Sequence, residues 1–236
     1  MAILISHCDK YFASRAAALV ESLRCQNYFG EIVIYAHDAE TEVFFHEKYR
    51  DEVLVVRVEE VMNSYTHLMH AKLFRPKNEF FFLLTPFLIK YTFEKIGKRE
   101  VWYIDADIFL FSSFKNLENQ IRDLSIMITP HNFPDRLRYL EKYGKFNVGV
   151  VFAKSDDDGI RVVNWWAERC IESTELKSSG EIYGDQKYLD NFHSISTKVG
   201  TFKGLGINAA PWNSTGIKKD STEFLCSDGS ILTAYH

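Results

Sequence analysis

The sequence lacks a run of apolar residues long enough to cross a bilayer. The longest run, FFFLLTPFLI at 80–89, contains a proline and stops at a lysine, whereas a membrane-spanning helix needs about 20 residues. The first ten residues lack the basic start and the long apolar core of a signal peptide, and they fit a first β-strand better. We therefore expect a cytoplasmic protein without a transmembrane segment, for which peripheral contact with a membrane stays open.

The sequence is also poor in cysteine and has no excess of basic charge. Its 236 residues include four cysteines and no Cys-x-x-Cys pair, which favours a reduced intracellular setting over a disulfide scaffold. A formal net charge of −4 gives no reason to expect nucleic-acid binding. Because 46% of the residues are hydrophobic and no repeat or low-complexity linker interrupts them, we expect one domain with a substantial core.

Strand and helix patterns alternate along the chain, which predicts an α/β fold with a mostly parallel sheet between helices. Two segments, 60–79 and 131–145, look irregular, and long loops in such proteins often cover a site. Two short runs around Asp228-Gly229 predict a C-terminal β-hairpin. The predicted strands are 2–6, 31–37, 52–58, 100–105, 124–130 and 146–154, and the predicted helices are 10–26, 85–97 and 156–173.

Two acidic residues stand inside an otherwise apolar stretch, VWYIDADIFLF at 101–111. In an extended chain Asp105 and Asp107 point to one side and Ala106 to the other. Two carboxylates at the end of a buried strand repel each other unless a cation lies between them. Oxygen ligands suit Mg²⁺ or Mn²⁺, and ligands of open α/β sheets bind beyond the carboxyl ends of the strands. The pair therefore predicts a metal site that binds a diphosphate. The alternative is that one aspartate caps a turn and the other is solvated.

This stretch resembles the Asp-x-Asp strand of GT-A glycosyltransferases, particularly glycosyltransferase family 8 and related bacterial nucleotide-diphospho-sugar transferases. Other segments resemble the same family in the same order over nearly the whole chain: ILISHCDKY, TPFLIKYTFEKIGKREVWYIDAD, FNVGVVFAK, GDQKYLDNF, GINAAPWN and ILTAYH. The resemblance implies a single GT-A (Rossmann-like) domain spanning 1–236. Its first half, 1–112, would bind the nucleotide, and its second half, 113–236, would bind the donor sugar and the acceptor.

The activity that this resemblance implies is transfer of a hexosyl group in polysaccharide biosynthesis. The donor would be a nucleotide sugar, with a UDP-sugar as the first choice, and the acceptor a glycan or a lipid-linked molecule. The anomeric configuration would be retained. A bound Mn²⁺ or Mg²⁺ would stabilise the charge that builds on the departing nucleoside diphosphate, acting as a Lewis acid.

Several residues receive a role from the resemblance. Asp105, Asp107 and His236 would bind the metal, while Asp185 and Gln186 would stand beside the donor sugar and its anomeric carbon. The first loop differs from the family, because Cys8 and Lys10 replace an acidic residue and an asparagine that family members often carry. The implied donor contacts are Ser6, His7, Cys8, Tyr11, Lys90, Asp105, Ala106, Asn147, Trp212 and Asn213.

A structural role is an alternative at several of these positions. Tyr11 could pack in the core, Asn147 could satisfy its own turn, Lys90 could lie on a helix surface, and Asp185 could cap the helix that follows it. His236 could simply be exposed. The sequence ends at this histidine, where the family commonly continues with an aromatic residue, a glycine and a lysine-bearing tail, so we expect either a truncated chain or a minimal member.

Three other functions compete with glycosyl transfer. A haloacid-dehalogenase-type phosphatase would use Asp105 as its nucleophile, but its Asp-x-Asp normally closes the first strand and is followed by Thr or Val. Here about 100 residues precede the pair, and Ile108 follows it. A nucleotidylyltransferase needs a glycine-rich basic loop after the first strand, which is missing. A non-catalytic nucleotide-sugar binding subunit remains open.

Overall fold

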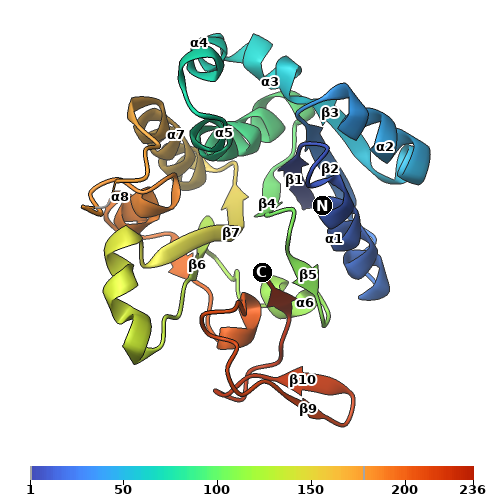
Figure 1. Cartoon of the computed structure of the whole chain (residues 1–236), viewed down its shortest axis with the longest axis vertical. Coiled ribbons are helices and arrows are strands. Elements are labelled where there is room, and N and C mark those ends of the chain that lie inside the picture. Colours follow the sequence, from blue (N-terminus) through green and yellow to red (C-terminus); the bar gives the residue numbers. More distant parts are fainter. Residues whose placement is uncertain (1, 178) are drawn as a thin grey trace.

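The computed structural model describes residues 2–177 and 179–236, and its centre is a seven-stranded sheet (Figure 1). The strand order is β3-β2-β1-β4-β7-β6-β8. Strand β7 is antiparallel to both of its neighbours, and the other strands all run in one direction, so the predicted mostly parallel sheet is confirmed. The strands are β1 (Ile3–Cys8), β2 (Glu31–Ala36), β3 (Leu54–Arg57), β4 (Glu100–Ile104), β6 (Ile126–Pro130), β7 (Phe146–Lys154) and β8 (Val199–Thr201).

Helices cover both faces of this sheet. None of the helices in the described part of the chain is both long enough and apolar enough to cross a membrane. The helices are α1 (Ala13–Cys25), α2 (Ala39–Tyr49), α3 (Val58–Ser64), α4 (His67–Phe74), α5 (Lys77–Tyr91), α6 (Lys115–Glu118), α7 (Asp157–Glu172) and α8 (Phe192–Ile195). Short 3₁₀ segments are η1 (Arg50–Glu52), η3 (Asp135–Tyr143), η4 (Gln186–Asn191) and η5 (Leu205–Ile207), and a π-helical segment, η2 (Thr92–Ile96), continues α5.

The strands send alternate side chains into two separate cores. Trp102 of β4 is fully buried against α1 together with Leu4 and Phe152. Its neighbour Tyr103 points to the opposite face, where it is buried under α5 and α7, which pack side by side (Figure 1). A strand that is covered on both faces reads as a continuous apolar run, because its period of two no longer separates polar from apolar positions. That is why residues 101–104 are uniformly apolar.

The structure corrects the prediction that residues 60–79 are irregular. This segment forms most of α3, all of α4 and the start of α5. Helix α5 starts at Lys77 rather than near position 85, and Pro86 lies well inside it. Proline is unusual so deep in a helix. Here burial of residues on most of the circumference, including Leu83, Leu84 and Phe87, stabilises the helix through its packing.

Two other differences concern local structure. Residues 135–143, within a segment expected to be irregular, form the 3₁₀ segment η3, which buries none of its residues. Helix α2 was not predicted, although its N-cap is visible in the sequence, since the carboxylate of Asp38 accepts hydrogen bonds from the N–H and hydroxyl of Thr41 at 2.8 and 2.6 Å. Its weak amphipathic pattern, with only Thr41, Phe45 and Tyr49 buried, hid the helix.

The C-terminal segment contains the predicted hairpin in a modified form. Strand β10 (Glu223–Leu225) pairs antiparallel with the preceding β9 (Lys218–Asp220). The predicted turn at Asp228-Gly229 is also present, with Gly229 at φ +80° and a single bridge between Leu225 and Ile231. The last strand, β11 (Ala234–Tyr235), pairs instead with β5 (Phe109–Leu110), directly after the acidic pair.

Candidate active site

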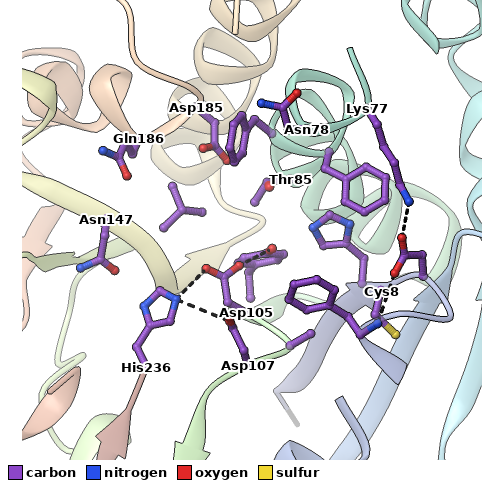
Figure 2. A pocket seen from close by; sticks show the side chains of 18 of the residues that line it. Cys8, Lys77, Asn78, Thr85, Asp105, Asp107, Asn147, Asp185, Gln186 and His236 are labelled. Carbon is purple, nitrogen blue, oxygen red and sulfur yellow. Dashed lines mark hydrogen bonds and ion pairs between the residues drawn. The ribbon is translucent and has the colours of Figure 1, made fainter. Parts of the chain in front are cut away.

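Asp105 and Asp107 lie in a tight turn at the end of β4, in the middle of the sheet. The N–H of Asp105 donates to the carbonyl of Gly149 on β7 at 2.9 Å, and the N–H of Ile108 donates back to the carbonyl of Asp105 at 3.2 Å. The expectation that an extended backbone places both carboxylates on one side was therefore wrong, because the strand ends at Ile104. The turn nevertheless brings both carboxylates toward the same histidine (Figure 2).

That histidine is His236, which the last strand places. Leu110 pairs with Ala234 and Phe109 with Tyr235, so the antiparallel register sets residue 236 opposite residue 108. The imidazole Nε2 of His236 lies 3.5 Å from Asp107 Oδ1 and 3.7 Å from Asp105 Oδ2 (Figure 2). Asp105 and Asp107, two positions apart in the sequence, thus converge with His236, which lies about 130 residues further along the chain.

These three side chains fit a divalent metal ion. Ligand atoms about 2.1 Å from a metal are at most about 4.2 Å apart, and both distances from His236 satisfy this limit. Both distances are longer than those of strong hydrogen bonds, so in the free chain the imidazole pairs only loosely with the two carboxylates. Two carboxylate oxygens with one imidazole nitrogen suit Mn²⁺ well and leave positions for phosphate oxygens. Within the described residues, this is the one cluster of at least three His, Cys, Asp or Glu side chains with such spacing.

Gly149 explains the Asn-x-Gly pattern in β7. A Cβ at this position would lie 2.8 Å from Nδ1 of His236 and 3.1 Å from Oδ1 of Asn147, so glycine leaves room for the histidine ring. The same Asn147 Oδ1 accepts the Gly149 N–H at 3.0 Å and an N–H of the Asn208 side chain at 2.8 Å. The backbone N–H can only donate, so the orientation of the Asn147 amide is set.

The charges of the site are strongly coupled. Burial raises the pKa of Asp105, opposed by His236 and by the Tyr103 hydroxyl, which donates to its Oδ1 at 2.7 Å. The imidazole of His236 lowers the pKa of Asp107. Burial lowers the pKa of His236, but the two carboxylates outweigh it and the net pKa is raised. Burial, reinforced by Asp105, raises the pKa of Asp185 to about 8.

We expect the affinity for Mn²⁺ to rise with pH. A metal ligand must be deprotonated, and both Asp105 and His236 hold their protons to a higher pH than in a free peptide. Protons therefore compete with the metal on the acidic side and leave as it binds. Electron paramagnetic resonance titrations between pH 5.5 and 8 measure this directly. Calorimetry in buffers of different ionisation enthalpy should show proton release, and an affinity independent of pH would contradict the ligand set.

Asp105, Asp107 and His236, called the metal group below, lie in the wall of a cavity of about 790 Å³. Most of the predicted site residues line this cavity. The predicted residues in this lining come from six separate segments of the sequence, several of which Figure 2 labels. Of the predicted residues, the lining includes His7, Cys8, Tyr11, Asp105, Ala106, Asp107, Asn147, Asp185, Gln186, Trp212 and His236.

The two ends of the cavity differ in character. At one end Tyr11 exposes 74% of its surface, so it does not belong to the core. The half-buried imidazole of His7 lies there too, with its Nδ1 2.8 Å from Nε2 of His37. At the other end Asp185 is buried and precedes η4 without a capping hydrogen bond from its side chain. Gln186 is held by donating to the carbonyl of Tyr143 at 3.0 Å. An exposed aromatic ring and buried polar groups thus flank the metal group.

Three predicted donor contacts lie outside this cavity. The ammonium of Lys90 donates to Asn164 on α7 at 2.9 Å, because Lys90 lies on the side of α5 that packs against α7. Ser6 is fully buried within β1. Asn213 accepts the Ala210 N–H and donates to the carbonyl of His131, so it holds a loop. The structure therefore does not bring these three side chains into the cavity, and the contacts they make are within the fold.

Sequence reasoning missed one whole wall of the cavity, which the first half of α5 provides. Its lining residues share the spacing of a single helix face, a signal that the segment 60–79 concealed when it was taken as irregular. They are Lys77, Asn78, Phe81, Phe82 and Thr85. Asp9, Phe12, Tyr103, His131 and Val148 complete the lining and were also not predicted.

The chain is similar in sequence to two proteins of Bacillus subtilis. No family model matches the chain. It is 26% identical to YfnF of Bacillus subtilis (strain 168) over 233 residues, which cover 94% of the chain and 76% of YfnF. It is 29% identical over 176 residues to YfnD of the same organism, covering 72% of the chain and 56% of YfnD. The match thus spans little more than half of the second relative.

Solved structures resemble the whole chain. The galactosyltransferase LgtC, in complex with donor and acceptor sugar analogues, matches with a TM-score of 0.67 at 17% identity, over all of this chain and 86% of LgtC. Mouse xyloside xylosyltransferase 1 matches with a TM-score of 0.61 at 12% identity, over all of this chain and 97% of the xylosyltransferase. Core-mannan synthase A of Aspergillus fumigatus, in its Mn/GDP form, matches with a TM-score of 0.52 at 9% identity. The match covers 85% of this chain and 72% of the synthase. The chain therefore has the GT-A fold of glycosyltransferases, as its sequence motifs predicted.

Proposed function

We propose that this chain is a metal-dependent glycosyltransferase of the family 8 type, which moves a sugar from a nucleotide-diphosphate sugar to a glycan or lipid-linked acceptor. The observation that carries the proposal is the convergence of Asp105, Asp107 and His236 in the wall of a large cavity on a GT-A fold. In this proposal residues 1–112 bind the nucleotide and 113–236 bind the donor sugar and acceptor.

Asp105, Asp107 and His236 would hold Mn²⁺ or Mg²⁺, which supplies Lewis-acid stabilisation of the leaving diphosphate. In the reaction, the bond between the anomeric carbon and the phosphate oxygen breaks, and its electron pair leaves with the nucleoside diphosphate. The acceptor hydroxyl oxygen bonds to the same carbon, and its proton passes to the departing diphosphate, which has taken the electron pair. Tyr103 donates to Asp105 Oδ1 and so keeps the other oxygen, Oδ2, directed toward His236.

The nucleoside would occupy the end of the cavity near His7, Cys8 and Tyr11, with the exposed Tyr11 ring stacking on the base. Burial raises the pKa of the Cys8 thiol to about 12, so this side chain is a neutral surface for the base. We propose a UDP-sugar as the first donor to test. Asn147, Trp212 and Gln186 then border the space left for the sugar and the acceptor.

We propose that the anomeric configuration is retained and that Asp185 contacts the donor sugar. Burial and the charge of Asp105 raise the pKa of Asp185 in the free chain, and a carboxyl that keeps its proton longer is suited to hydrogen bonding with the sugar.

The proposal is tested by measuring thermal stability with a panel of nucleotide sugars, with and without Mn²⁺. A ligand at 100 times its Kd stabilises by about 2.7 kcal/mol, which is a Tm rise of roughly 5–10 °C for a chain of this size. We expect the rise for one donor, only with Mn²⁺, together with its slow hydrolysis. Binding without turnover would identify a binding subunit instead. Release of phosphate from an aryl phosphate would identify a phosphatase.

A further inference from the structure

The charges around the candidate metal site leave a bound diphosphate uncompensated. Asp105 and Asp107 carry two negative charges when ionised, and one divalent ion offsets them. This inference rests on the proposed function: the diphosphate of a nucleotide sugar adds about two further negative charges, and a third develops as the glycosidic bond breaks. A site that binds and releases this group needs another cation within reach of the metal ligands.

Arg15, in the first turn of α1, is placed to supply this charge. Its Nη1 lies 3.9 Å from Oδ2 of Asp107, on the carboxylate oxygen that does not face His236. Its guanidinium stacks on the ring of Phe12 at 4.6 Å from the ring centre, and Phe12 lines the cavity. Stacking holds the group beside the cavity without using its hydrogen-bond donors.

The other cations near the cavity are already engaged. Lys77 forms a close ion pair with the buried carboxylate of Asp9. Lys10 pairs with Glu40 at 2.9 Å. Lys90 bonds to Asn164 outside the cavity. In contrast, no hydrogen bond of the Arg15 side chain is found within residues 2–177 and 179–236, and its side chain is 58% exposed. Arg15 therefore has its donors available for an incoming anion.

We infer that Arg15 binds the diphosphate of the nucleotide from the side of the metal site formed by Asp107. The planar guanidinium presents two parallel N–H groups that match two phosphate oxygens. In the absence of nucleotide the same group weakly offsets Asp107. On nucleotide entry it moves from the carboxylate to the phosphate. Arg15 thus belongs to the donor site although no sequence motif marks it.

The test compares Arg15→Gln and Arg15→Lys with the wild-type chain, using UDP, GDP and dTDP as probes. Calorimetry at saturating Mn²⁺ should show about tenfold weaker binding of the preferred nucleotide to Arg15→Gln. The nucleotide affinity of Arg15→Lys should lie between those of the wild type and Arg15→Gln. Lysine keeps the positive charge but lacks the two parallel N–H groups of the guanidinium. Mn²⁺ affinity without nucleotide, measured by paramagnetic resonance, should be unchanged or tighter in Arg15→Gln, since a cation near Asp107 is removed.

Lys48→Gln is the matched control, because it removes one exposed, ion-paired positive charge from the neighbouring helix α2. It should leave both affinities unchanged. If Arg15→Gln binds the nucleotide as tightly as the wild type, or changes only the Mn²⁺ affinity, Arg15 is a solvated partner of Asp107 and the inference is wrong, while the proposed function stands. If the wild type binds none of the three nucleotides with Mn²⁺, the proposed function and this inference both fail.

Discussion

Replacing Asp105 or Asp107 by asparagine is expected to abolish Mn²⁺ binding and to lower turnover by roughly a thousandfold, the scale of losing a major transition-state electrostatic contact. An amide oxygen has nearly the shape of a carboxylate oxygen but lacks its charge. The replacement therefore removes the attraction for the metal and leaves the geometry. Of the two, Asp105 lies deeper and is held by Tyr103, so its loss also removes the best-positioned ligand.

The measurement separates loss of metal from loss of fold. Without metal, Asp105→Asn should unfold at the same or a higher urea concentration, because burial raises the pKa of Asp105 and an uncharged amide avoids that cost. Paramagnetic resonance should at the same time show free Mn²⁺. Asp123→Asn, on an exposed aspartate in a surface turn before β6, is the control and should change neither quantity. Retained Mn²⁺ affinity in both site variants would eliminate the metal site.

Gly149→Ala should weaken Mn²⁺ binding about 10- to 100-fold while changing the fold little. The new methyl group would overlap His236, whose Nδ1 would lie 2.8 Å away. Overpacking of this kind costs about 1–3 kcal/mol where the surroundings cannot move. The ring of His236 is only partly buried, so it can rotate about its side-chain bonds and relieve the contact. The fold then keeps its stability, but the imidazole leaves Asp105 and Asp107.

A double-mutant cycle tests this explanation of Gly149. In a His236→Ala background there is no ring to displace, so adding Gly149→Ala should have little further effect on Mn²⁺ affinity. Equal effects of Gly149→Ala with and without the His236 ring would show that the methyl group acts on Asn147, whose Oδ1 would lie 3.1 Å away, or on the strand itself. Urea unfolding of each variant shows whether β7 is intact.

The site depends on contacts between segments that are far apart in the sequence. Ala209 accepts the backbone N–H of His236 at 2.8 Å and donates its own N–H to Ala234 at 2.9 Å. The adjacent Asn208 donates to Asn147 on β7. The segment around 208 thus connects the strand that carries the histidine with the strand that carries Gly149. A change at position 208 should therefore be read as a change in the site, although Asn208 does not line the cavity.

Sequence patterns predicted the fold well and the site in part. The apolar strand before Asp105 and the ordered segments after it were enough for the GT-A fold, which the structure and its relatives confirm. The metal and donor assignments stay predictions, although the geometry places most of these residues around one cavity. Because the start of α5 was predicted too late, the cavity wall formed by Lys77 to Thr85 was missed. The side of α5 on which Lys90 lies was decided by the packing of α5 on α7.

What the sequence by itself determined is the local chemistry: two acids at the end of a buried strand, a glycine two residues after an asparagine, and a terminal histidine. Their meeting point was decided only by the tertiary structure. The β5–β11 register sets His236 beside Asp107, and the absent side chain of Gly149 makes room for its ring. The physical reason is that ligand geometry needs agreement within a few tenths of an ångström between segments more than 100 residues apart, and only packing provides it.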